Sequence, residues 1–385
     1  MSSKGLYCEN KTLRACYKPI DINSTVSRYF DSCWMRIDPS MDSSEAFSTD
    51  PRLVQPEWSL IGDGVLYMFL SIAGVIMNSL ILLAIIKNSK IRKEYLCPTI
   101  MSLASSDFLF SIYVAPAISL RGFTKDLLIP QGCAFHFIVF YGLWDVSASS
   151  LLCMAVLRCF RLFFPANSLT CAQNQWFQYA SKIAPGMFWV IAILIQVPTL
   201  IKEYGRFGLE CKTFICIIVD IDKNGYQHSS HPYNLLLGII LLKGGFATVL
   251  NVVTYFRVKK IAQKFDMGQK QLQQERKLGI MVMTITVSFL IVYCPLIVTV
   301  SVNRNVAVTN PIAASVCVFL ANTLVIIDPI VVVMTQTIYK EEVREALENV
   351  YHLFRDITKY SNKTESNIEI ELTNKTSLEE STHAF

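Results

Sequence analysis

Seven long apolar runs constrain this chain more than any other feature of its sequence. Most reach the length of about 20 residues that an α-helix needs to cross about 30 Å of hydrocarbon. An unpaired backbone amide in lipid costs several kcal/mol, and the runs are too long for barrel strands, so we expect membrane-spanning helices. The expected spans are Val65–Ile86, Leu96–Leu120, Gly132–Phe163, Ile183–Ile201, Tyr233–Phe256, Leu278–Val302 and Asn305–Ile338.

The composition indicates a membrane protein and excludes a soluble enzyme. The 385-residue chain is 52% hydrophobic and only 17% charged, with a mean hydropathy of +0.39. A soluble surface of this size would need roughly 25% charged residues. The net charge of +5 is too small to indicate a nucleic-acid partner. We predict an all-α membrane protein, a seven-transmembrane helix bundle at residues 65–338 that is not an enzyme.

Positive charge sets the expected orientation. With the N-terminus outside, the inner loops hold about twice as many Lys and Arg residues as the outer loops, as the positive-inside rule requires. Residues 1–64 then form an extracellular tail at the plasma membrane, with glycosylation sequons at Asn10 and Asn23. The first residues lack an apolar core and a cleavage site, so the first helix is expected to direct insertion.

Two segments are expected after the bundle. Residues 339–354 space apolar side chains three or four apart between charges, which predicts a short amphipathic eighth helix along the inner membrane face. Residues 355–385 are polar and rich in Ser and Thr, so we expect a disordered cytoplasmic tail. Phosphorylation would let this tail recruit arrestin, and an unmodified solvated tail is an equal alternative.

Cysteine placement agrees with this topology. On the expected oxidising side lie six cysteines whose pairing the sequence alone does not assign: Cys8, Cys16, Cys33, Cys133, Cys211 and Cys216. We expect free thiols, acting as small apolar groups, at the other six positions: Cys97, Cys153, Cys159, Cys171, Cys294 and Cys317.

Buried acids indicate a candidate ion site. An ionisable group in hydrocarbon costs at least about 2.5 kcal/mol, which makes a carboxyl within a span a candidate functional group. The second and seventh spans contain Asp107 and Asp328, and Asn78 and Ser147 add oxygens from the first and third. Such oxygen ligands suit sodium. The alternative is that one carboxyl stays protonated and donates a hydrogen bond between helices.

Opposite charges occur at matched depth in two further spans. Asp145 lies near the middle of the third span and Lys243 near the middle of the fifth. Either charge alone would be strongly disfavoured, so the match predicts a buried ion pair. Two interpretations stay open, a static bridge between helices and a ligand site in which Lys243 meets an anionic headgroup.

Short motifs occur in a fixed order along the spans. GVIMN ends at Asn78, LASSD ends at Asp107, and Cys133 precedes Arg158 in the third span. The later spans add Trp189, Tyr255, Phe289 with Pro295, and Asp328-Pro329. Together these motifs resemble the rhodopsin-like (class A) G-protein-coupled receptors over about residues 60–355. The resemblance implies a receptor for an extracellular ligand that couples to a heterotrimeric G protein through Arg158 and Tyr255, and it strengthens the sodium interpretation.

Two further stretches narrow the resemblance. EYGRFGLE at residues 203–210, followed by Cys216-Ile217, and FYGLWDVSASSLL at residues 140–152 are similar to the arthropod moody and trapped-in-endoderm group of orphan receptors. This likeness implies that Cys133 pairs with Cys216, which leaves Cys211 for the N-terminal cysteines.

The chain departs from the class at its activation motifs. Leu157 stands where the class has an acid before the arginine, and Val332 replaces the tyrosine of the seventh-helix motif. Tyr293 replaces the usual sixth-helix tryptophan, and Ala247 replaces a fifth-helix proline. The fold is unaffected. These changes are compatible with high basal signalling, biased signalling, or binding without G-protein activation.

The sequence narrows the class of ligand without identifying the ligand. Phe140 stands where aminergic receptors have an acid, so a monoamine is not expected. A largely apolar pocket is predicted, with Lys243 favouring an acidic group; a lipid, a small acid and a peptide all remain open. Besides Lys243 and Asp145, the predicted pocket residues are Phe140, Tyr141, Trp144 and Tyr293.

Two other functions are alternatives to a signalling receptor. A non-signalling scavenger receptor fits the altered motifs, and a transporter could use the intramembrane charges, although the chain shows no internal repeat. On the inner side, the basic stretch 257–277 would contact a G protein or anionic membrane lipids.

Overall fold

The computed structural model describes most of the membrane-embedded chain. The described residues are 6–9, 13–17, 34–36, 47–49, 57–124, 130–163, 171–196, 206–209, 216–221, 227–229, 231–264, 269–297, 311–352 and 355. They divide into two compact units, Met1–Gln336 and Thr337–Phe385, and each is described here by itself.

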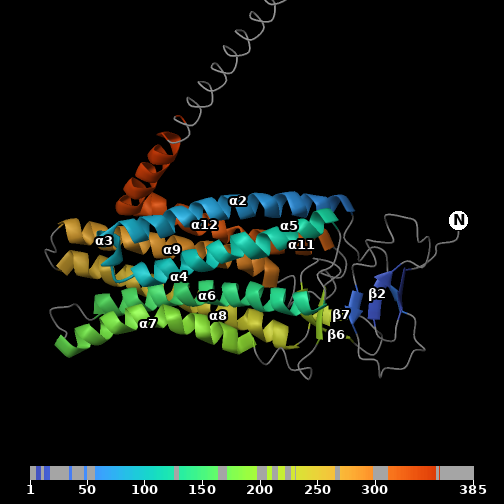
Figure 1. The fold of residues 1–385 in the computed structure, drawn as a ribbon. Helices are drawn as coiled ribbons and strands as arrows, with labels where there is room; N and C mark the ends of the chain where they lie inside the picture. Colours follow the sequence, from blue (N-terminus) through green and yellow to red (C-terminus); the bar gives the residue numbers. More distant parts are fainter. Residues whose placement is uncertain are drawn as a thin grey trace, which may run out of the picture. The chain divides into compact units, whose positions relative to one another are not determined.

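The first unit is built around a helical bundle (Figure 1). Seven segments of its described residues are long and apolar enough to cross a membrane, which confirms the predicted fold. The second span is interrupted by a π-helical turn and the seventh by a break at Thr323. The helices are α2 (Glu57–Lys87), α3 (Ser89–Arg92), α4 (Cys97–Leu109), η2 (Phe110–Val114), α5 (Ala115–Thr124), α6 (Pro130–Phe163), α7 (Cys171–Gln196), α8 (His231–Lys264), α9 (Gln269–Ile297), α11 (Pro311–Asn322) and α12 (Leu324–Thr335).

Helix ends differ from the predicted spans. Helix α2 begins at Glu57, so the predicted boundary at residue 64 falls inside it, and α7 begins at Cys171 rather than Ile183. Apolar runs locate only the part of a helix within hydrocarbon, because backbone hydrogen bonding continues through polar residues beyond it. In the second unit, the helix predicted at 339–354 occupies residues 337–352 of the described chain.

Small residues bring the first two spans into close contact. A Cβ atom on Gly122 of α5 would lie 2.5 Å from the Leu60 carbonyl oxygen and 2.8 Å from Gly64 Cα, both on α2. Ser119 Oγ on α5 also donates a 2.6 Å hydrogen bond to the Gly64 carbonyl. Without a hydrophobic driving force between helices in lipid, such close packing and hydrogen bonding stabilise the crossing.

The buried and exposed faces of the helices separate clearly. The largest fully buried side chains include Phe137, Phe140 and Tyr141 of α6 and Phe289 of α9. Large apolar side chains are exposed on other faces of the bundle helices, as expected for surfaces that face lipid. The most exposed include Phe69, Leu242, Phe246, Ile291 and Met334.

Two small antiparallel sheets lie outside the helices in sequence. The first has the order β3-β2-β1-β4 and is formed by β1 (Leu6–Glu9), β2 (Leu13–Tyr17), β3 (Trp34–Arg36) and β4 (Phe47–Thr49). The second lies between α7 and α8 and has the order β5-β6-β7, formed by β5 (Arg206–Leu209), β6 (Cys216–Ile221) and β7 (Gln227–Ser229). Both β5 and β6 contact α6. The sequence analysis did not predict either sheet.

Candidate functional site

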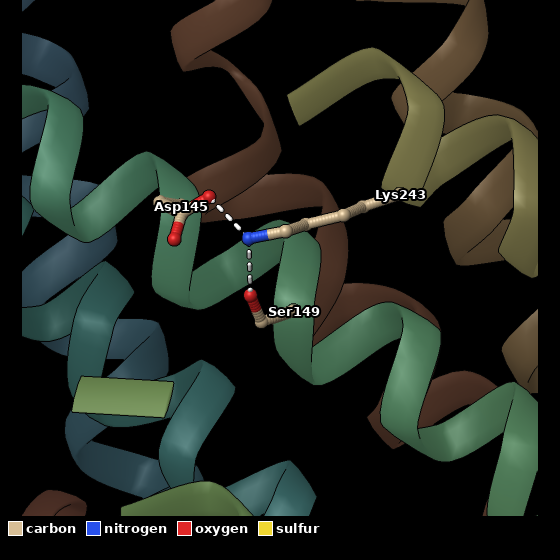
Figure 2. Close-up of polar contacts among 3 residues, drawn as sticks. All are labelled: Asp145, Ser149 and Lys243. Atoms are coloured by element: carbon tan, nitrogen blue, oxygen red, sulfur yellow. Dashed lines mark hydrogen bonds and ion pairs between the residues drawn. The ribbon is translucent and has the colours of Figure 1, made fainter. Parts of the chain in front are cut away.

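A buried ion pair connects α6 to α8 at the middle of the bundle. Lys243 Nζ lies 2.5 Å from Asp145 Oδ1 and donates a second hydrogen bond, 3.0 Å long, to Ser149 Oγ. Figure 2 shows the lysine reaching across to both side chains of α6, which are one turn apart. The Asp145 side chain is 0% exposed and that of Lys243 19%. The predicted ion pair is therefore present.

Helix α8 approaches α9 closely beside this pair. A Cβ atom on Gly244 would lie 2.6 Å from Phe289 Cδ1, whereas one on Gly245 would meet nothing within 4 Å. Only the first glycine is therefore needed for the close approach. The Phe289 ring stacks on Tyr293 at 4.3 Å between centroids.

The predicted pocket residues of α6 and α9 lie together. The ring of Trp144 is 4.4 Å from that of Phe140, 5.4 Å from Tyr141 and 5.1 Å from Tyr293, measured between centroids. All four side chains are buried. They pack on one another, so in this conformation they form an aromatic core between α6 and α9.

A hydrogen-bond chain crosses this core, and the sequence analysis missed it. Trp144 Nε1 donates to Asn322 Oδ1 over 3.0 Å, and Asn322 Nδ2 donates to the Tyr67 hydroxyl over 2.8 Å. The chain joins α6, α11 and α2, and all three residues are buried. The available signal was the amide of Asn322 near the middle of the seventh apolar run, because a polar side chain in a span usually pairs with another helix.

The predicted ion-site residues are only partly connected. Ser147 Oγ donates to Asp107 Oδ1 over 3.3 Å and lies 2.9 Å from Ser106 Oγ. Asp328 is buried as well, on α12. Asn78 instead donates to two backbone carbonyl oxygens, those of Gly74 and Val325, over 2.9 and 2.8 Å.

Three oxygens at these positions are buried without a hydrogen-bond partner. Within the described residues, Asp107 Oδ2, Asp328 Oδ1 and Asn78 Oδ1 accept no hydrogen bond. Carboxylate and amide oxygens are the ligands of hard cations. The described chain contains no group of three or more His, Cys, Asp or Glu side chains suited to a metal ion. These oxygens are of the kind that the sodium prediction requires, and a protonated carboxyl is the alternative.

Arg158 lies near the C-terminal end of α6, against α9. It is 2% exposed, and its Nη2 donates to the backbone carbonyl of Glu275 over 3.5 Å. Tyr255, the other predicted coupling residue, is 51% exposed and packs edge-on against Phe256. The structure therefore does not bring Arg158 and Tyr255 together.

The Glu275 carboxylate is directed to a different arginine. Arg161 Nε lies 3.9 Å from Glu275 Oε1, and its guanidinium sits 4.3 Å from the centroid of the Tyr95 ring. Burial raises the pKa of the Tyr95 phenol above its usual range, and it also raises the pKa of Glu94 beside it. Tyr95 therefore stays neutral at physiological pH.

The statistical model of the 7 transmembrane receptor (rhodopsin family) matches residues 77–331, more than half of the chain. The chain belongs to this family. It is a multi-pass plasma-membrane receptor and not an enzyme.

Curated relatives and a solved structure agree with this assignment. The receptor is 21% identical over 293 residues to Protein trapped in endoderm-1 of Drosophila melanogaster, covering 69% of this chain and 72% of that one. It is 29% identical over 169 residues to the G-protein coupled receptor moody of the same species, covering 43% of this chain but only 24% of moody. The resemblance to that group is confirmed. The crystal structure of squid rhodopsin shares the fold, with a TM-score of 0.60 at 15% identity over 79% of this chain and 91% of that chain.

Several predicted features of the receptor lie outside the described part. Asn10 and Asn23 are not described, and for Cys133 and Cys216 the description covers the backbone but not the side chain. Their disulfide and the two glycans stay predictions. Of the six predicted free thiols, five are free, and the side chain of Cys171 is outside the description.

Proposed function

We propose that this receptor carries its N-terminal tail outside the cell and activates a heterotrimeric G protein through the inner end of α6. An outer ligand would shift the population of helix arrangements and open a cytoplasmic cleft around Arg158. The supporting observation is the position of Arg158 on α6, a cation 2% exposed that, among the described residues, is linked to α9 by a single long hydrogen bond. A charge so weakly held is suited to move.

The proposed ligand is not an amine and carries an acidic or strongly polar group. Lys243 is the charged pocket residue that keeps partial exposure, while its partner Asp145 is fully buried. An anionic group on a lipid, a small acid or a peptide would compete with Asp145 for Lys243. Because Ser149 also accepts from Lys243, the ammonium would keep one protein contact during that exchange.

Two further partners belong to the proposal. A sodium ion would bind between Asp107 and Asp328, using the three buried oxygens of these residues and Asn78. Arrestin would bind the Ser- and Thr-rich tail after phosphorylation. Basic residues of 257–277 would rest on anionic lipid headgroups or on the G protein.

Guanine-nucleotide exchange in membranes tests the coupling. We expect the unaltered receptor to accelerate exchange and Arg158→Ala to lose that effect at equal surface expression. Arg344→Ala is a matched control, because the same change is made at a side chain that is 75% exposed. Equal exchange from the unaltered receptor and Arg158→Ala would exclude coupling through Arg158 and favour a receptor that binds without signalling.

A further inference from the structure

The guanidinium of Arg158 rests on a bare stretch of the α9 backbone. A Cβ atom built on Gly279 would lie 2.7 Å from Arg158 Cζ and 3.0 Å from Nη1, and nearer still to Nη2. Real Cβ atoms do not approach neighbours that closely. The present position of Arg158 therefore requires that residue 279 have no side chain.

Charge pairing does not explain why Arg158 stays in this position. The preceding residue is Leu157, which offers no carboxylate. The Glu275 carboxylate makes its ion pair with Arg161 and interacts with Arg158 only through space, so the hydrogen bond that Arg158 makes within the described residues goes to the Glu275 backbone oxygen, at 3.5 Å. Within the described residues, Nε of Arg158 has no hydrogen-bond partner.

The remaining link between the inner ends of α6 and α9 is weak. The side chains of Arg161 and Glu275 are 45% and 14% exposed, and their charged atoms are 3.9 Å apart. A half-exposed pair of this length contributes little to stability. Glu275 and Gly279 are four residues apart and share one face of α9, so together they form the surface against which Arg158 packs.

We propose that Gly279 is a positioning residue for Arg158. Its bare backbone lets the guanidinium lie against α9 in the resting receptor, in place of the restraint that an acid at position 157 would supply. The inference rests on the proposed function, because it assigns the regulation of the same coupling residue. A methyl group at position 279 would displace the end of the flexible arginine, since the α9 backbone is held by its own hydrogen bonds.

The test is Gly279→Ala, read out as the distance between the inner ends of α6 and α9. Spin-labelled amino acids introduced at Val156 and Gln274 report this distance by double electron–electron resonance. We expect the distance distribution to shift outward and basal nucleotide exchange to rise severalfold. Gly245→Ala, where a Cβ meets nothing within 4 Å, should leave both unchanged.

The double variant separates positioning from a structural effect. If Gly279 acts through Arg158, Gly279→Ala should produce no distance shift in an Arg158→Ala background, because the clash is gone. An equal shift in that background, or no shift in the single variant, would overturn the inference. In a further outcome, Gly279→Ala shifts the distance while neither this variant nor the unaltered receptor accelerates nucleotide exchange. That result would contradict the proposed coupling and leave the positioning role of Gly279 standing.

A second double variant controls for misfolding of Gly279→Ala. If Gly279→Ala fails to reach the cell surface, Gly279→Ala with Arg158→Lys is measured, because a lysine lacks the broad guanidinium that meets the methyl group. Recovery of surface expression supports the inference. Failure to recover overturns it, since the defect would then not depend on the guanidinium.

Discussion

Lys243 of α8 and Asp145 of α6 are joined across 2.5 Å, and the acid is completely buried. Asp145 Oδ2 finds no hydrogen-bond partner within the described residues. The charge of Asp145 is therefore compensated mainly by Lys243. Removing either partner leaves an uncompensated charge in a low-dielectric environment.

Loss of Lys243 should destabilise the receptor through Asp145. We expect Lys243→Met to cost about 3–5 kcal/mol, the usual effect of breaking a buried pair. Surface expression should fall, and Asp145→Leu combined with Lys243→Met should restore it. Normal expression of Lys243→Met with a lost ligand response would instead assign Lys243 to ligand binding.

Gly244 and Gly245 should respond differently to the same substitution. Gly244→Ala places a methyl group against Phe289, and overpacking of this kind costs about 1–3 kcal/mol. Gly245→Ala should be neutral or slightly stabilising, because its Cβ meets open space and alanine favours helix. Thermal unfolding in detergent measures both. Equal melting temperatures for the two variants would contradict the close approach of α8 and α9.

The hydrogen-bond chain through Asn322 should contribute to stability. Asn322→Leu leaves the Trp144 indole and the Tyr67 hydroxyl buried without their partner, which costs about 1–3 kcal/mol. Thr323→Ala is the control, since that hydroxyl makes a local, exposed hydrogen bond. The measurement is the shift in thermal midpoint. A shift no larger than that of the control would show that the chain is not formed.

Sodium should stabilise the receptor through Asp107. We expect a higher melting temperature in sodium chloride than in choline chloride at equal ionic strength, because carboxylate and amide oxygens ligate a small hard cation such as sodium and not the large choline ion. Asp107→Asn should abolish the difference. If the unaltered receptor melts equally in both salts, the protonated-carboxyl interpretation is correct.

Features that depend on depth along a helix could be predicted from the sequence. The Asp145–Lys243 pair follows from counting residues from each helix end, and the spans follow from apolar length. Features that depend on how a helix is rotated about its own axis could not be predicted from the sequence. Whether Arg158 meets Gly279, or Trp144 meets Asn322, is decided by which faces two helices present to each other.

The same limit applies to the coupling residues and the pocket. Arg158 and Tyr255 both stand near the C-terminal ends of their helices, but the Tyr255 side chain is exposed, and no sequence spacing within one helix determines which way it faces. The aromatic residues of α6 and α9 were predicted to line a ligand pocket, and the structure shows them buried against one another. Their packing on one another depends on side-chain conformations that a linear motif does not encode.

A stable complex between the receptor and a nucleotide-free G protein would show coupling directly. Purified receptor and heterotrimer are mixed, bound nucleotide is removed enzymatically, and the co-eluting heterotrimer is quantified by size-exclusion chromatography. We predict a complex that dissociates on adding a non-hydrolysable GTP analogue and that Arg158→Ala does not form. Equal complex formation by both chains, or none by either, would contradict the central claim that Arg158 couples this receptor to a G protein.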